Sequence, residues 1–284
     1  MGIVDLFFPR QVKCVVCGDE VDKFGICEKC SRLLTLIPAP TCEICGGENS
    51  GKGKVCFECK GRHFNFEKNY SIFSYVNNVR DMVVNFKQNG NKAIGEMFAY
   101  FIADKYDEII SKHNVNLIIP VPISDGRLKT RKFNQSEVLC SQISEQNKIN
   151  NSLLIRTKET PHQTGLSRQN REDNLKASFE VKDKKILKGK NILIVDDIYT
   201  TGATLNACAK VLKDAGAKEI ITLTLARAVV KKDKIIDWFY LYNLGGCSCY
   251  TFVIIIRTYW YLILDICQYV RVLWQKHRFN ILTI

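Results

Sequence analysis

Residues 191–204 have the sequence NILIVDDIYTTGAT. The apolar run Ile192 to Val195 is typical of a buried strand, and two adjacent carboxylates, Asp196 and Asp197, follow at its carboxyl end. A loop rich in threonine and glycine then opens a helix that we predict over residues 201–215. The backbone N–H groups of such a loop, with a helix N-terminus behind them, form a site for an anion such as phosphate.

The residue types of this loop suit a phosphorylated sugar. Thr200, Thr201 and Thr204 carry hydroxyl groups, and Gly202 has no Cβ, so the backbone can approach a ligand closely. The two carboxylates lie just upstream, where the 2- and 3-hydroxyls of a phosphoribosyl group would need acceptors. A buried strand capped by a turn is the simpler interpretation, but it does not explain two acidic side chains beside these hydroxyl and glycine positions.

Strand and helix patterns alternate on both sides of this stretch. The predicted strands cover residues 71–76, 115–122, 153–157, 190–198 and 219–230, and the predicted helices cover residues 78–89, 93–110, 126–146 and 201–215. This alternation predicts an α/β fold with a mostly parallel sheet flanked by helices. In such folds the ligand binds at the carboxyl ends of the strands.

Eight of the 13 cysteines form four CxxC pairs in the first 60 residues, separated by nine, eleven and ten residues. Each CxxC turn presents two thiolates, and two turns complete the tetrahedral four-sulfur shell of a structural zinc ion. We predict two zinc ions, one on the first four cysteines and one on the last four, with a cross-braced pairing as the alternative. The predicted ligands are Cys14, Cys17, Cys27, Cys30, Cys42, Cys45, Cys56 and Cys59.

Four-sulfur sites have no open coordination position, so this segment is expected to be structural rather than catalytic. An iron–sulfur cluster is the main competitor, but its cysteines usually show tighter or less regular spacing. Gly18 and Gly46 directly follow the second cysteine of a pair, where the backbone must turn toward the sulfurs. His63 lies four residues after Cys59 and could replace a ligand; because all eight cysteines already pair, we expect it on the surface.

Composition limits the class of protein. The chain has 284 residues, of which 46% are hydrophobic and 25% charged, and these values exclude disorder, a collagen-like sequence and a coiled coil. The N-terminus shows no signal peptide, so we expect the cytoplasm, where cysteines stay reduced and a high count indicates metal binding. The net charge is +12, and +10 of it lies in residues 61–236.

The stretch 192–204 resembles the phosphoribosyl pyrophosphate signature of type I phosphoribosyltransferases. From Cys14 to about Ala228 the chain resembles one branch of that superfamily, the ComF family linked to natural competence, whose fold is a type I phosphoribosyltransferase with a small N-terminal double zinc ribbon. Besides the four CxxC pairs, the resemblance rests on Lys87, Pro120-Val-Pro122, Arg127, Arg131-Lys-Phe-Asn-Gln135, Arg156, the run Pro161 to Asn174, and Phe179. Lys132 departs from the family, which usually has glycine there.

The resemblance assigns roles to the strand and to the loop after it. Asp196 and Asp197 would hold the ribose, with a magnesium ion nearby. The loop would cradle the 5-phosphate through Thr200, Thr201, Gly202, Ala203 and Thr204.

The resemblance also assigns roles to two basic segments. The pyrophosphate would lie against the segment with Arg127, Lys129, Arg131 and Lys132, since a cluster of cations suits a dianion; a solvated helix face is the simpler interpretation. The run from Gln163 to Asn174 resembles a mobile loop that closes over the reacting centre. Its candidate ligand contacts are Gln163, Arg168 and Arg171. The resemblance implies that Arg171, together with Asp196 and Asp197, is catalytic.

Two functions are compatible with these sequence features. The resemblance implies a protein that binds phosphoribosyl pyrophosphate and acts in the uptake or processing of single-stranded DNA, with a helicase-like ATPase as partner. As an enzyme it would be a phosphoribosyltransferase, a pentosyl-transferring glycosyltransferase, although no pattern indicates an acceptor. The alternative is a non-catalytic factor of the same fold that binds single-stranded DNA or protein. The positive charge of residues 61–236 would attract phosphodiesters, and the aromatic rings of Arg62-His-Phe-Asn-Phe66 could stack on bases.

We expect a double zinc ribbon over residues 1–62, a phosphoribosyltransferase-like domain over 63–236 and an atypical hydrophobic tail over 237–284. The apolar run 250–274 is long enough to span a bilayer, but Arg257, Asp265 and Arg271 interrupt it. Attachment to the inner face of the membrane, packing on the body and an aberrant end are the alternatives, and we favour the last.

Overall fold

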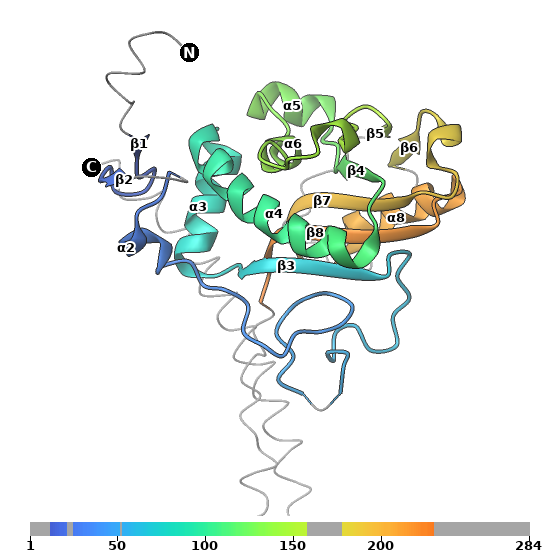
Figure 1. Cartoon of the computed structure of the whole chain (residues 1–284), viewed down its shortest axis with the longest axis horizontal. Coiled ribbons are helices and arrows are strands. Elements are labelled where there is room, and N and C mark those ends of the chain that lie inside the picture. The colour runs from blue at the N-terminus through green and yellow to red at the C-terminus, as the bar shows by residue number, and fades with distance from the viewer. Residues whose placement is uncertain (1–11, 22–24, 52, 158–177, 230–284) are drawn as a thin grey trace, which may run out of the picture. The chain divides into compact units, whose positions relative to one another are not determined.

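The computed structural model describes residues 12–21, 25–51, 53–157 and 178–229 (Figure 1). Residues 12–21 contain two short antiparallel strands, β1 (Val12–Lys13) and β2 (Glu20–Val21). The predicted hydrophobic tail lies outside the described residues. Within the described ranges, no helix has the length and apolar character needed to cross a membrane.

A four-stranded sheet forms the centre of the fold (Figure 1). Its order is β3 (Lys68–Ser74), β8 (Glu219–Arg227), β7 (Asn191–Tyr199) and β4 (Leu117–Pro120), and all three ladders are parallel. Successive side chains of β7 point to opposite faces, so Leu193 and Val195 enter one hydrophobic core while Ile192 and Ile194 enter the other. The predicted α/β fold with a mostly parallel sheet is confirmed.

Helices cover both faces of this sheet (Figure 1). One face carries α3 (Asn77–Gln88), α4 (Lys92–His113) and α6 (Gln135–Leu139), whose buried residues share a core with Leu193 and Val195. The other face carries α8 (Ala203–Asp214), whose Leu205 and Ala209 pack with Ile194. A short helix η2 (Lys184–Leu187) precedes β7.

The prediction of a single helix over residues 126–146 is wrong. The structure has α5 (Asp125–Arg131), then a break, then α6 and a short helix η1 (Gln146–Lys148). The break occurs because Lys132 adopts the left-handed conformation, with φ 68°, and ends α5. Asn134 then starts α6, since its side-chain oxygen accepts a hydrogen bond from the backbone N–H of Ser136 at 3.1 Å.

The strand predicted at 153–157 exists but does not join the parallel sheet. It is β5 (Leu154–Arg156), and it pairs antiparallel with β6 (Phe179–Val181). This small ladder contributes Leu154, Phe179 and Val181 to the core on the α8 side.

The N-terminal segment, which contains a short helix α2 (Glu28–Ser31), runs along the outer edge of β3. The N–H of Ile37 donates to the carbonyl of Ile72 at 3.1 Å, and the N–H of Ser74 donates to the carbonyl of Thr35 at 2.8 Å. The edge strand of the sheet is therefore not left with open backbone groups along this stretch.

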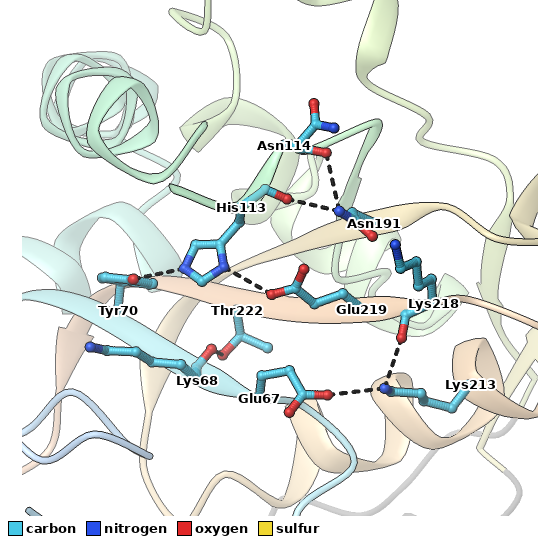
Figure 2. Close-up of polar contacts among 10 residues, drawn as sticks. All are labelled: Glu67, Lys68, Tyr70, His113, Asn114, Asn191, Lys213, Lys218, Glu219 and Thr222. Carbon is cyan, nitrogen blue, oxygen red and sulfur yellow. Dashed lines mark hydrogen bonds and ion pairs between the residues drawn. The ribbon is translucent and has the colours of Figure 1, made fainter. Parts of the chain in front are cut away.

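A polar cluster joins the amino ends of the strands to the end of α4 (Figure 2). His113, the last residue of α4, contacts the Tyr70 hydroxyl through Nε2 and the Glu219 carboxylate through Nδ1, each at 2.9 Å. The Asn191 amide donates to the carbonyl of His113 at 2.9 Å, so the cluster links β3, β7 and β8 to α4. It lies at the end of the sheet opposite to the carboxyl ends of the strands, and we assign it a structural role.

Candidate functional site

The eight CxxC cysteines form two groups of four. The first contains Cys14, Cys17, Cys27 and Cys30, and the second contains Cys42, Cys45, Cys56 and Cys59, so the sequential pairing is the one observed. Four sulfurs around a zinc ion at about 2.3 Å lie about 3.8 Å apart. The Sγ atoms of Cys17 and Cys27 are 3.6 Å apart, and those of Cys45 and Cys56 are 3.8 Å apart, so both groups fit a structural zinc ion.

Backbone groups support both metal sites. The N–H of Cys30 donates to the Sγ of Cys27 and the N–H of Cys56 donates to the Sγ of Cys42, each at 3.4 Å. Gly46 adopts the expected left-handed turn, with φ 65°, after its pair of cysteines. His63 is exposed and belongs to neither group, in agreement with its predicted place on the surface.

The acidic pair lies at the carboxyl end of β7. Pairing between β4 and β7 ends at Pro120 with Val195, so Asp196 and Asp197 project beyond the end of β4. Asp197 forms an ion pair with Lys87 of α3, with 2.8 Å between Oδ1 and Nζ, and their side chains are only 12% and 21% exposed.

Among the described residues, hydrogen bonds hold the carboxyl group of Asp196. Its Oδ1 accepts from the Ser136 hydroxyl at 3.1 Å and from the N–H of Asp197 at 2.9 Å. Burial and the neighbouring charge of Asp197 raise the pKa of Asp196 to about 7, while Lys87 acts in the opposite direction. The pair therefore presents carboxyl oxygens at the end of the sheet, which suit the hydroxyl groups of a sugar.

The loop after the acidic pair has the geometry expected of an anion site. Gly202 is the N-cap of α8 in the left-handed conformation, with φ 78°, and the N–H of Ala203, the first residue of the helix, donates to the Thr201 hydroxyl at 3.4 Å. A Cβ at this position would lie 2.3 Å from the Tyr199 hydroxyl, so only glycine fits. Thr200 is exposed, and Thr201 and Thr204 are partly exposed, so the loop can reach a ligand.

The basic segment follows β4 at the same end of the sheet. Arg127 and Arg131 are partly buried, whereas Lys129 and Lys132 are exposed. The guanidinium of Arg131 donates to the Gln135 side-chain oxygen at 2.9 Å.

Two cations near the acidic pair received no site role from the sequence. One is Lys87, described above. The other is Arg156 at the end of β5, whose guanidinium lies 5.4 Å from the centre of the Phe179 ring. Its pKa is lowered mainly by burial and further by Arg127, while Asp196 acts in the opposite direction, so Arg127 and Asp196 each lie within electrostatic reach of Arg156. Both cations belong to the motifs that carry the resemblance, and this was the only sequence signal for them.

Several predicted contacts lie outside the described residues. They are Gln163, Arg168 and Arg171 of the predicted closing loop. In the described part, Phe66 is buried and packs edge-on against Tyr199 at 6.5 Å, so it is unavailable to stack on a base.

Family models match two parts of the chain: a double zinc ribbon domain over residues 3–60 and a phosphoribosyl transferase domain over residues 95–248. Competence protein F of Haemophilus influenzae is 30% identical over 224 residues, which cover 76% of this chain and 97% of that protein. Competence protein ComFC of Streptococcus pneumoniae is 27% identical, with 76% and 100% covered. DNA utilization protein YhgH of Escherichia coli (strain K12) is 25% identical, with 72% and 92% covered.

Proposed function

The chain belongs to the competence protein F family, in which a double zinc ribbon precedes a phosphoribosyl transferase domain, and we propose that it binds phosphoribosyl pyrophosphate together with magnesium. One observation carries this proposal. Residues 198–202 connect the acidic pair near the carboxyl end of β7 to the N-terminus of α8, so acceptors for sugar hydroxyls and donors for a phosphate lie within one short stretch of chain.

Each part of the ligand has a matching group. The ribose hydroxyls would lie against Asp196 and Asp197, and the 5-phosphate against the N–H groups and hydroxyls of residues 200–204. The pyrophosphate would meet Arg127 and Arg131, with Arg156 adding charge from β5. Magnesium, when bound, would neutralise charge on the pyrophosphate.

We extend the proposal to the predicted closing loop. Gln163, Arg168 and Arg171 would complete the cation shell around the pyrophosphate. Phosphoribosyl transfer in such a site depends on positioning and charge neutralisation as pyrophosphate leaves, and a dedicated general base is often unnecessary.

We also propose that the protein acts in DNA uptake, in the cytoplasm, on single-stranded DNA and with a helicase-like ATPase. The names of the similar proteins, competence protein and DNA utilization protein, support this role. The charge of residues 61–236 supports it too, because an excess of +10 attracts a phosphodiester backbone.

Calorimetry tests the proposed ligand. The full chain should bind phosphoribosyl pyrophosphate in the presence of Mg²⁺, and the Asp196→Asn/Asp197→Asn variant should bind it at least tenfold more weakly. Asp214→Asn is the matched control, because Asp214 is exposed at the far end of α8 and pairs only with Lys210 among the described residues. Equal affinity in the wild type and the double variant would contradict the proposal.

The same variants separate this ligand from DNA. The double substitution should leave the affinity for a labelled single-stranded oligonucleotide unchanged. In both proteins this affinity should fall steeply when the salt concentration is raised from about 50 to about 200 mM. A DNA affinity that does not depend on salt would contradict the proposed attraction of DNA to the positive charge of residues 61–236.

A further inference from the structure

Two arginines connect the second zinc ribbon, which contains Cys42, Cys45, Cys56 and Cys59, to the loop of residues 200–204. We call this loop the phosphate loop. Arg62 follows the last zinc ligand, Cys59, by three residues, and its Nη1 donates to the carbonyl of Thr201 at 3.1 Å. Arg227, at the end of β8, donates from Nη1 to the carbonyl of Thr200 at 3.0 Å. Two consecutive peptide groups of the loop are therefore each held by a guanidinium.

These contacts set the direction of the loop's N–H groups. In a planar trans peptide the carbonyl and the following N–H point in opposite directions. Fixing the Thr200 carbonyl therefore orients the Thr201 N–H, and fixing the Thr201 carbonyl orients the Gly202 N–H. Both arginines approach the carbonyl side, so the N–H groups are turned away from them, toward the side left for the ligand.

The ribbon also sets the position of Arg227. Its Nη2 forms an ion pair at 2.6 Å with Glu58, which lies between the zinc ligands Cys56 and Cys59, and its side chain is only 7% exposed. Its guanidinium lies 4.8 Å from the centre of the Tyr199 ring. Because Glu58 is part of the metal-binding turn, the shape of that turn determines where Arg227 can sit.

A further pair of contacts joins the chain just after the second ribbon to the first turn of α8. The side-chain oxygen of Asn206 accepts from the backbone N–H of Asn65 at 2.7 Å and from its side-chain amide at 2.9 Å. The Thr201 carbonyl and the first turn of α8 therefore form hydrogen bonds with Arg62 and Asn65. The Thr200 carbonyl is connected to Glu58 through Arg227.

The first ribbon packs elsewhere. Cys14 and Cys30 belong to the core on the α3–α4 face of the sheet, whereas Cys42, Cys45 and Cys59 belong to the core on the α8 face. The two zinc sites are therefore not equivalent with respect to the phosphate loop.

We propose that Arg62 and Arg227 are positioning residues for the phosphate loop, and that zinc in the second ribbon, but not in the first, is required for the loop to bind its ligand. This inference rests on the proposed function, since it concerns the same phosphoribosyl site.

Arg62 provides the first test, because it is partly exposed and can be replaced without opening a core. Arg62→Ala should weaken binding of phosphoribosyl pyrophosphate with Mg²⁺ about tenfold, as expected for the loss of one charge-assisted hydrogen bond. Arg62→Lys should restore part of the affinity, and Lys60→Ala, an exposed neighbour, should leave it unchanged. Wild-type affinity in Arg62→Ala would overturn the proposal.

Hydrogen exchange of the ligand-free protein keeps this test separate from that of the proposed function. The amides of Ala203 and Asn206, which donate to the Thr201 hydroxyl at 3.4 Å and to the Gly202 carbonyl at 2.8 Å, should exchange about tenfold faster in Arg62→Ala than in the wild type, with no change in β8. If the wild type binds no phosphoribosyl pyrophosphate, the proposed function fails while the exchange rates still decide whether Arg62 holds the loop. Unchanged exchange would overturn the positioning role.

Zinc removal provides the second test. Cys17→Ser and Cys56→Ser should each lower the zinc content measured by metal analysis from two ions to one, but only Cys56→Ser should lose affinity for the ligand and speed exchange in the loop. Equal effects of the two substitutions would overturn the assignment to the second ribbon. If Cys56→Ser does not fold, Arg62→Ala still tests the same connection.

Discussion

The ion pair between Lys87 and Asp197 should be the most costly charge pair to break near the acidic site. Both side chains are mostly buried, and Asp196 lies next to Asp197, so Lys87→Met leaves a carboxylate without its cation beside a second carboxyl group. Removing one partner of a fully buried pair costs about 3–5 kcal/mol, and the residual exposure of this pair reduces our expectation to about 2–3 kcal/mol. The substitution should also raise the pKa of Asp196 further, because Lys87 now lowers it.

Urea denaturation followed by circular dichroism measures this loss. Lys92→Met is the matched control, since Lys92 pairs with Glu96 at 3.4 Å with both side chains about half exposed, and it should cost less than about 0.5 kcal/mol. Adding Asp197→Asn to Lys87→Met should recover most of the lost stability, because the unpaired charge is then gone. The reasoning is refuted if Lys87→Met costs no more than Lys92→Met, or if the second substitution recovers nothing.

Three further predictions follow from single positions. Lys132→Gly should raise the free energy of unfolding by about 1 kcal/mol, because Lys132 adopts a φ of 68°, which glycine tolerates better. Lys132→Ala should not raise it, and an equal increase in both variants would contradict this explanation. The pKa of Asp196 rises from 3.8 to about 7 on folding, so the folded state binds the proton more tightly, and stability should fall as pH rises from about 4 to about 7, by at most about 1.4 kcal/mol per pH unit. Asp196→Asn should flatten that slope in denaturation curves, and an unchanged slope would exclude Asp196 as its source. Gly202→Ala should abolish binding of phosphoribosyl pyrophosphate in calorimetry, whereas Gly189→Ala, also at positive φ but with open space around it, should only lower stability.

The sheet could be predicted because its strands are buried on both faces. Strands of that kind appear as apolar runs, and such runs are easy to recognise: residues 192–195 are continuously apolar, and residues 220–226 are interrupted only by the buried Thr222 and Thr224. The zinc ligands could be predicted for a similar reason, since the CxxC spacing itself fixes the local geometry of each pair.

The parts that could not be predicted depend on backbone strain or on distant contacts. Lysine is a good helix former, so nothing in the local pattern shows that Lys132 ends α5 in the left-handed conformation. Lys87 and Arg62 reach their partners from segments about 110 and 139 residues away, and apolar periodicity carries no information about such pairs. The face on which each ribbon packs is likewise a tertiary property.

The order of the strands has a consequence for synthesis of the chain. The first strand of the sheet, β3, pairs with the last, β8, and Ser71 faces Thr224 across 153 residues of sequence. At elongation rates of about 5–20 residues per second, β3 leaves the ribosome roughly 8–30 s before its partner exists. Among the described residues that precede it, Thr35 and Ile37 already offer it backbone hydrogen bonds. The segment between the two ribbons can therefore cover the outer edge of β3 early, which leaves a single open edge on this strand until β8 is made.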